Sequence, residues 1–207
     1  MRLLVVGATG PLGRDVVADA VARGHRVAAL VRDAGRAALG DDVELVVGDV
    51  LAPASLSPAV RDRDAVICAL GTASVRRRST LLQDGTANLV AAMNAVGVGR
   101  LVCVTVIGTG ASRANASLFQ REVILRVLAP MLPDKEQQEQ VVRASGLDWV
   151  LVRPPRFRPG PARGALRVAR EGEPGRFGQV VRADLARFLV DCATDGTYAR
   201  EAVVVGS

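Results

Sequence analysis

The stretch LLVVGATGPLGRDVVADAVA, residues 3–22, decides the fold class of this chain of 207 residues. The apolar run Leu3–Val6 has the composition of a strand that is buried on both faces. Three glycines come next, and residues 12–23 then read as a helix, with Pro11 near its first turn, where a missing N–H is harmless. The stretch therefore predicts a strand, a glycine-rich turn and a helix in direct succession.

The three glycines, Gly7, Gly10 and Gly13, form the pattern G-x-x-G-x-x-G. In this context the first glycine allows a tight turn, the second lets the backbone approach a pyrophosphate, and the third lets helix and strand pack together. The free N–H groups and the dipole at the start of the helix favour an anion at the same place. The pattern predicts a dinucleotide site. The alternative is a turn whose glycines serve helix packing alone.

The rest of the chain alternates apolar runs with helical stretches, which predicts an α/β fold: a doubly wound, mainly parallel sheet. The expected strands are residues 3–6, 26–31, 43–47, 65–70, 101–107, 149–152 and 202–205, and the expected helices are residues 12–23, 80–96, 135–144 and 183–193. With no repeat or long linker, we expect one domain over residues 1–207. Residues 153–180 follow a strand directly and are expected to form a small C-terminal loop region on the substrate side, or an ordinary surface loop.

Composition narrows the class of protein further. Hydrophobic residues make up 49% of the chain and aromatic residues only 3%, so the core must consist mainly of Val, Ala and Leu. No apolar run of about 18 residues occurs, so we expect no membrane-spanning helix. The net charge is +6, but the arginines are scattered among acids without aromatic residues between them, so no nucleic-acid partner is expected. The cysteines have no metal-ligand spacing and are expected to be reduced thiols of a cytoplasmic protein without a metal site: Cys68, Cys103 and Cys192.

The end of the second expected strand bears on the choice of dinucleotide. An NAD site usually has an acid there, whereas this strand ends at Val31 and is followed by Arg32 and Arg36. A guanidinium at this place can bind a 2′-phosphate, so we expect NADP(H) as cofactor. Asp33 would oppose NADP if its side chain turned inward, and we interpret it as a turn residue. An Arg–Asp pair in solvent is the alternative interpretation.

Two other strand ends carry residues that suit a dinucleotide. Asp49 follows the third expected strand and could accept a hydrogen bond from an adenine amino group. Gly71, between Leu70 and Thr72, follows the fourth, where a glycine lets the backbone pass close to a cofactor. Each of the two is also compatible with an ordinary turn.

Six motifs in this order resemble the atypical short-chain dehydrogenase/reductases with an NAD(P)H-binding Rossmann domain, the NmrA-like group included: GATGPLG, ALVRDAGR, VVGDV, DAVICALGT, DGTANLVAAMNAVGV and ASGLDWVLVRPP. Within that group the chain most resembles the biliverdin-IXβ reductase/flavin reductase branch. The resemblance implies further cofactor contacts at Thr9, Pro11, Leu12, Val50, Leu70 and Thr72, and nicotinamide contacts near Leu82, Pro154 and Pro155.

The same resemblance implies where the substrate would bind. The flavin reductase relatives carry two histidines that line the substrate pocket, and the corresponding places here hold Lys135 and Arg156. Other atypical members have a lysine at the first place, in a K-x-x-x-E pattern that includes Glu139 here. A serine near the nicotinamide is replaced by Val106, and Thr105 is the nearest hydroxyl. The candidate catalytic residues are therefore Lys135 and Thr105, with Arg156 and Phe157 on the substrate side.

The chemistry open to this chain is limited by its few proton donors. The only tyrosine is Tyr198, and the residue four positions later is Ala202, so the Tyr-x-x-x-Lys pair of ordinary short-chain dehydrogenases is missing. The only histidine, His25, precedes the second strand, at the wrong end of the sheet for catalysis. We therefore expect hydride transfer to a planar or anionic small molecule that takes its proton from water, such as a flavin.

Two other functions fit the same residues. A non-catalytic NADP(H)-binding redox sensor would also lack the tyrosine. A specialised biosynthetic reductase, isomerase or cyclase would use residues 153–178 to shape its pocket. The chain is expected to be a monomer or a homodimer.

Overall fold

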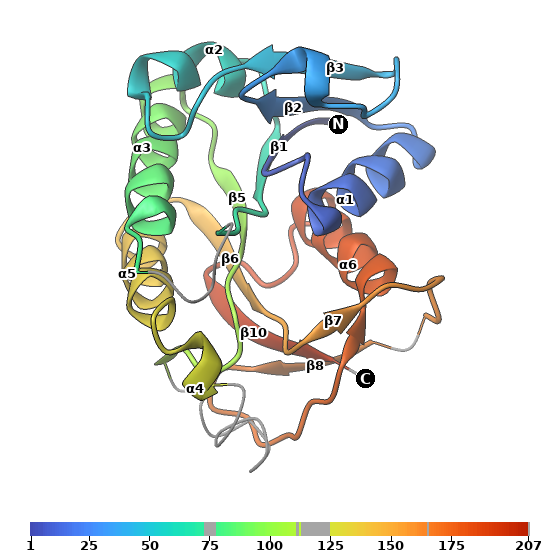
Figure 1. Ribbon diagram of the computed structural model, residues 1–207, viewed down its shortest axis with the longest axis vertical. Helices are drawn as coiled ribbons and strands as arrows, with labels where there is room; N and C mark the ends of the chain where they lie inside the picture. Colours follow the sequence, from blue (N-terminus) through green and yellow to red (C-terminus); the bar gives the residue numbers. More distant parts are fainter. Residues whose placement is uncertain (73–77, 111, 113–124, 165, 207) are drawn as a thin grey trace.

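A twisted sheet of eight strands runs through the molecule in the order β3-β2-β1-β4-β5-β6-β10-β8 (Figure 1). This computed structural model describes residues 1–72, 78–110, 112, 125–164 and 166–206. The strands of this sheet are β1 (Arg2–Val6), β2 (Arg26–Val31), β3 (Val43–Val47), β4 (Ala65–Cys68), β5 (Arg100–Val104), β6 (Asp148–Arg153), β8 (Arg167–Arg170) and β10 (Glu201–Gly206). A separate small sheet pairs β7 (Phe157–Arg158) with β9 (Val180–Val181).

All neighbouring strands of the large sheet are parallel except β10 and β8, which are antiparallel. The central strands β1, β4 and β5 are buried along almost their whole length, which explains their continuous Val, Leu and Ile composition. The crossover between β1 and β4 through β2 and β3 reverses the direction in which strands are added. The carboxyl ends of β1 and β4 therefore lie at the switch point of a doubly wound sheet.

Helices cover both faces of the sheet. Helices α1 (Pro11–Ala22) and α6 (Arg182–Thr194) pack against each other on one face, and α2 (Leu56–Val60), α3 (Leu81–Val96) and α5 (Leu132–Arg143) cover the other (Figure 1). Short elements complete the described chain: α4 (Leu125–Leu128) and the 3-10 turns η1 (Ala34–Arg36) and η2 (Pro53–Ser55). Each face of the sheet thus has its own hydrophobic core.

The expected α/β fold with a doubly wound, mainly parallel sheet is confirmed, as are the expected positions of its strands. The differences lie at the ends of elements. Strands β4 and β5 end at Cys68 and Val104, before the expected residues 70 and 107, because the backbone there turns into the loops at the edge of the sheet. Helix α5 begins at Leu132 rather than at residue 135, with Pro133 in its first turn, where proline is favourable.

Residues 153–180 are more ordered than the sequence indicates. The expectation of a loop region is wrong for residues 167–170, which form β8 and add an antiparallel edge to the sheet beside β10. The strand is hard to recognise in the sequence, because only Val168 and Ala169 are apolar and both flanking residues are exposed arginines. All three cysteines are free and buried, as expected: Cys68, Cys103 and Cys192.

Candidate functional site

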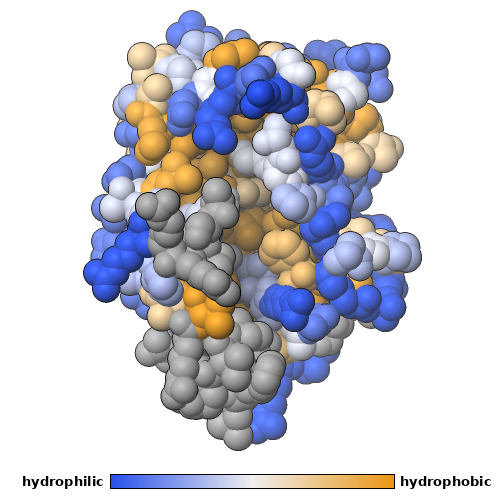
Figure 2. Space-filling model, in the orientation of Figure 1, coloured by the Kyte–Doolittle hydropathy of each residue, from blue (hydrophilic) through white to orange (hydrophobic). Residues whose placement is uncertain are grey.

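The carboxyl ends of β1, β4, β5 and β6 lie next to one another, because these strands are parallel neighbours in the sheet. Figure 2, drawn in the orientation of Figure 1, shows a hollow in the middle of the molecule with hydrophobic residues on its floor. In Figure 1 this place lies between α3 and α5 on one side and α1 and α6 on the other. Every strand end that the sequence marked as a ligand contact lies at this edge, because these strands are parallel, and that of β3 lies farthest out, beyond β2.

The glycine-rich turn between β1 and α1 has the shape of a cradle. Gly7 has φ +83°, and a Cβ atom on it would lie 2.5 Å from the carbonyl oxygen of Ala69, so the turn needs glycine there. A Cβ on Gly13 would lie 2.1 Å from the carbonyl oxygen of Gly7, which shows how closely helix and strand approach. A Cβ on Gly10 would meet only the Gly7 oxygen, at 3.3 Å, and would otherwise stand in open space.

The start of α1 leaves hydrogen-bond donors free for a ligand. Gly10 is the N-cap residue and, among the described residues, no side chain caps the helix; its first turn also has no acid. The first N–H groups, including those of Leu12 and Gly13, have no partner within a helix. The side chain of Arg14 stabilises the turn by donating to the carbonyl oxygens of Thr9 at 3.1 Å and Ala38 at 2.7 Å. An open cradle with free N–H groups fits the pyrophosphate of a dinucleotide.

The residues expected at the adenosine end lie at the end of β2. Arg32 is exposed and has no ion pair with any of the described residues. Asp33 accepts a hydrogen bond from the N–H of Gly35 at 2.9 Å and caps η1, so it is the turn residue that the sequence predicts. Arg36 lies 3.6 Å from Asp33, and this pair is exposed to solvent. The Arg32 guanidinium is therefore available to an anion.

The loop after β3 is firmly held. The Asp49 carboxylate accepts from the N–H of Leu51 at 2.9 Å, which forms a local turn. Val50 is buried against α3, where a Cβ on Gly85 would lie 2.8 Å from its Cγ2 atom. Asn88 donates to the Val50 carbonyl oxygen at 2.9 Å. Asp49 keeps its second carboxylate oxygen without a partner in the described part of the chain.

Lys135, a candidate catalytic residue, lies beneath the edge of the sheet and is only 4% exposed. Its Nζ donates to the carbonyl oxygen of Val104 at 2.9 Å and to Oε1 of Gln138 at 3.0 Å, and lies 3.5 Å from the carbonyl oxygen of Leu70. Burial lowers the pKa of Lys135 below its ordinary value. The ammonium thus links the carboxyl ends of β4 and β5 through their carbonyl oxygens. The backbone of these strands lies between the ammonium and the hollow.

Two thiols lie beside this lysine. Cys68 and Cys103 are register partners on β4 and β5, and both are completely buried. A hydrogen bond between the two thiols, helped by the N–H of Leu70 and the charge of Lys135, lowers the pKa of Cys68 to about 7. The same bond, together with burial, raises the pKa of Cys103.

Thr105, the other candidate catalytic residue, is 5% exposed and donates its hydroxyl hydrogen to Oε1 of Glu139 at 2.7 Å. Glu139 also binds Arg153, whose Nε and Nη2 lie 3.0 Å and 2.5 Å from its two oxygens. Burial alone would raise the pKa of Glu139, but the hydrogen bonds and charge of Arg153 more than offset it, so this pKa lies below its ordinary value. The hydroxyl of Thr105 is thus tied to a buried ion pair.

The remaining expected contacts surround the loop after β6. Pro154 and Pro155 are buried, and the carbonyl oxygen of Pro154 accepts from the N–H of Ile107 at 3.0 Å. Arg156 and Phe157 are exposed, Phe157 to 41%. Leu82 is completely buried, and its N–H donates to Asp134 at 3.2 Å, so the structure does not bring its side chain to the surface of the hollow.

Sequence reasoning missed the charged residues beneath the site. Asp134 caps α3 from the neighbouring helix, since it accepts from the N–H groups of Leu82 and Gln83. Arg153 is the largest fully buried side chain in the described part of the chain and pairs with both Glu139 and Glu171. The only signal was the K-x-x-x-E spacing, which places Lys135 and Glu139 one turn apart on the same side of α5.

No group of three or more His, Cys, Asp or Glu side chains among the described residues could hold a metal ion. No helix in the described part of the chain is long and apolar enough to cross a membrane.

Comparison with known sequences identifies a family. A family model described as NAD(P)H-binding matches residues 7–196. The photosystem II assembly factor Ycf39 of Synechocystis is 30% identical over 220 residues, which cover 100% of this chain and 63% of that protein. The 3-diazoavenalumate denitrifying reductase of a Streptomyces species is 41% identical over 151 residues, which cover 63% of this chain and 45% of that protein. The chain thus spans less than two thirds of the length of both relatives.

Solved structures share the whole fold. An anaerobilin reductase, ChuY of Escherichia coli O157:H7, superimposes with a TM-score of 0.83 at 23% identity and covers 100% of this chain and 97% of its own. A short-chain dehydrogenase/reductase of Veillonella parvula in complex with NADP has a TM-score of 0.83 at 18% identity and covers 100% of this chain and 94% of its own. At these identities the likeness establishes the Rossmann fold.

Proposed function

This chain belongs to the NAD(P)H-binding family, and from that premise we propose that it is an NADPH-dependent reductase that transfers a hydride to a flavin or a similar planar conjugated acceptor. The observation that carries the proposal is the glycine cradle, open at Gly10 and lined by the start of α1, with Arg32, which has no ion pair among the described residues, at the end of β2. The NADP bound to the Veillonella structure supports a nicotinamide cofactor in this fold.

In this proposal the cofactor residues divide into two groups. The cradle and the start of α1 hold the pyrophosphate, and Arg32, with Arg36 nearby, binds the 2′-phosphate through charge-assisted hydrogen bonds. The loops after β4, β5 and β6 receive the nicotinamide ring, which supplies the hydride when the cofactor is bound. Lys135 supports these loops from below through the carbonyl oxygens of Val104 and Leu70.

The acceptor must need little acid–base help from the protein. The only tyrosine, Tyr198, precedes β10, which is parallel to β6, so this residue lies at the amino edge of the sheet, opposite the hollow. Thr105 has its one hydroxyl hydrogen bound to Glu139. A flavin or another conjugated acceptor takes its proton from water, and the protein then contributes orientation and electrostatics. The exposed Arg156 and Phe157 suit a planar, anionic acceptor.

A direct test is NADPH oxidation by the pure protein, followed at 340 nm, with FMN, riboflavin, a quinone and biliverdin as acceptors and NADH as control. NADPH-selective turnover with any of these acceptors supports the reductase. Tight NADPH binding without turnover of any acceptor contradicts it and favours a redox sensor.

The second candidate is a reductase of one dedicated metabolite. The relative that favours it is the 3-diazoavenalumate denitrifying reductase, at 41% identity. By its name the substrate of that reductase is a carboxylate with a diazo group. Adding an aromatic diazo carboxylate to the acceptor panel separates the two candidates, because a flavin reductase would leave it unreduced.

The unpaired cysteines favour the cytoplasm as the compartment.

A further inference from the structure

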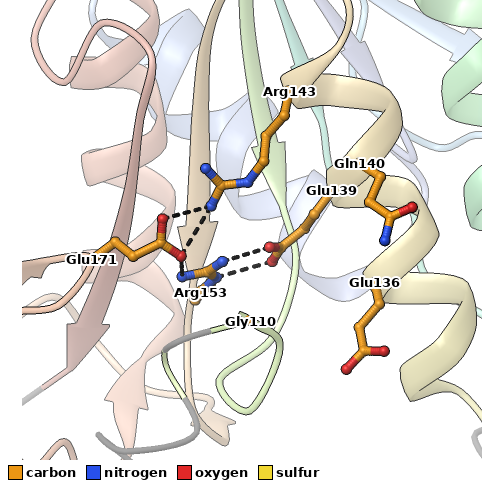
Figure 3. A pocket seen from close by; sticks show the side chains of 7 residues that line it. All are labelled: Gly110, Glu136, Glu139, Gln140, Arg143, Arg153 and Glu171. Carbon is orange, nitrogen blue, oxygen red and sulfur yellow. Dashed lines mark hydrogen bonds and ion pairs between the residues drawn. The ribbon is translucent and has the colours of Figure 1, made fainter.

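Glu139 is the centre of a buried cluster that joins two loops of the hollow. Its carboxylate, 4% exposed, accepts from the hydroxyl groups of Thr105 at 2.7 Å and Thr109 at 2.6 Å, and from the guanidinium of Arg153 at 3.0 Å and 2.5 Å. Figure 3 shows this carboxylate facing the guanidinium of Arg153 from α5. The Thr109 hydroxyl also lies 2.9 Å from the carbonyl oxygen of Val106, so its one hydrogen is shared between these two acceptors.

The partners of Glu139 lie at the carboxyl ends of β5 and β6, where the proposed hydride transfer would take place. Thr105 and Thr109 follow β5, and Arg153 is the last residue of β6, directly before Pro154. The backbone joins the same segments, since the N–H of Ile107 donates to the carbonyl oxygen of Pro154 at 3.0 Å. Glu139 thus contacts both of these segments from α5.

The charge of Arg153 is balanced from a second side. This residue is completely buried, and Glu171 lies 2.8 Å from its Nη1, while Arg143 lies 2.8 Å from Glu171 (Figure 3). A cavity of about 290 Å³ opens beside this group of charges. Gly110 leaves room for the guanidinium, because a Cβ there would lie 2.9 Å from Nη2 of Arg153. A buried ion pair of this kind is costly to break, since the remaining charge stays uncompensated.

We propose that Glu139 is a positioning residue of the proposed reductase: through Thr105, Thr109 and Arg153 it holds the loops after β5 and β6 where nicotinamide and acceptor meet. The inference rests on the proposed function and deepens it. A glutamine at this place could accept hydrogen bonds on one oxygen only and would direct its NH₂ group at donors.

The test compares Glu139→Gln with Glu136→Gln. Glu136 lies about one turn earlier on α5 and lines the same cavity, but its side chain is exposed and makes no hydrogen bond or ion pair with the described residues, so it is the matched control. Hydride transfer is measured in single turnovers with the best acceptor of the panel, well below the melting temperature of each variant. We expect Glu139→Gln to slow this step at least tenfold while the Kd for NADPH changes less than threefold, because the cradle and Arg32 are untouched. The control should match the wild type in both.

A double-mutant cycle with Thr105→Val tests whether Glu139 influences hydride transfer through its hydrogen bond with Thr105. If Glu139 acts through Thr105, the loss caused by Glu139→Gln shrinks when Thr105 is already valine. Full additivity of the two losses, or a wild-type rate in Glu139→Gln, overturns the proposal. A purely structural role would lower the melting temperature without this coupling.

A readout without turnover separates this inference from the proposed function. The fluorescence of bound NADPH reports the surroundings of its nicotinamide ring. If the wild type binds NADPH but reduces no acceptor, the reductase proposal fails. A changed emission in Glu139→Gln, and not in Glu136→Gln, then still supports the positioning role, whereas unchanged emission in both overturns it.

Discussion

The glycine-rich turn predicts opposite effects for two similar substitutions, Gly13→Ala and Gly10→Ala. At Gly13 the new methyl group would lie 2.1 Å from the carbonyl oxygen of Gly7 and 2.7 Å from the Cα atom of Ala8. Both are backbone atoms, so α1 would have to move away from β1 by about 1.3 Å to reach ordinary contact. Overpacking of this kind costs roughly 1–3 kcal/mol or more, partly offset by about 1 kcal/mol from the better helix propensity of alanine.

At Gly10 the same methyl group would stand 3.3 Å from one backbone oxygen and otherwise face open space. The fold should therefore tolerate Gly10→Ala at a cost below about 1 kcal/mol. The methyl group would occupy the place where a pyrophosphate must approach the backbone. We expect the affinity for NADPH to fall at least tenfold, which corresponds to about 1.4 kcal/mol.

Thermal unfolding and fluorescence titration with NADPH measure both quantities on each variant. A loss of about 2 kcal/mol in Gly13→Ala corresponds to a melting temperature lower by about 4–8 °C for a chain of this size. Gly10→Ala should melt within about 3 °C of the wild type, with the weaker binding as its main defect. A Gly10→Ala protein that binds NADPH as the wild type does would refute the cradle as the cofactor site. A Gly13→Ala protein of unchanged stability would refute the packing argument.

Three further predictions concern charge. Arg32→Ala is expected to weaken NADPH binding about tenfold or more with little effect on NADH, since a charge-assisted hydrogen bond contributes roughly 1.5–3 kcal/mol; equal losses in titrations with both would contradict the 2′-phosphate contact. Cys192, whose pKa burial raises to about 12, should not react with a thiol reagent in the native protein near pH 8, and rapid labelling detected by mass spectrometry would show that it is accessible. Glu139 has a lowered pKa, so its stabilising effect is present above the ordinary value of 4.5 and is lost as the pH falls through the folded value. The difference in unfolding free energy between wild type and Glu139→Gln should therefore shrink on acidification, and a constant difference from about pH 7 to pH 3 would count against it.

The cofactor side of the site could be predicted from the sequence because its signals are local. Gly7, Gly10 and Gly13 stand within seven residues, and their spacing reflects contacts inside one turn and one helix. Asp33 likewise forms its hydrogen bond with Gly35, two residues away. Periodicity found the strands of the parallel sheet for the same reason, because burial on both faces leaves an unbroken apolar run.

Periodicity failed at a short edge strand with charged ends and where polar residues are buried in pairs. The strand at residues 167–170 contains two arginines and reads as a loop, yet it pairs with β10 through its backbone. Lys135 appears in the sequence as a helical lysine free to reach a substrate, but its Nζ is bound to carbonyl oxygens more than 30 residues away in the chain. No sequence pattern near Lys135 indicates hydrogen-bond partners that lie so far away in the chain.

The charged cluster is the clearest case of information that only the fold supplies. Glu139 meets Arg153, Thr109 and Thr105 across separations of 14, 30 and 34 residues, so α5 and the carboxyl ends of both β5 and β6 must be in place before all of these bonds exist. The apolar runs bring β5 and β6 together, but they leave the distance between the following loops open. A buried carboxylate that needs several donors at once allows one arrangement of these loops and penalises others, since each lost bond leaves charge without a partner. The hydrophobic pattern thus determines which strands are neighbours, and we infer that the buried charges determine how their loops meet above the hollow.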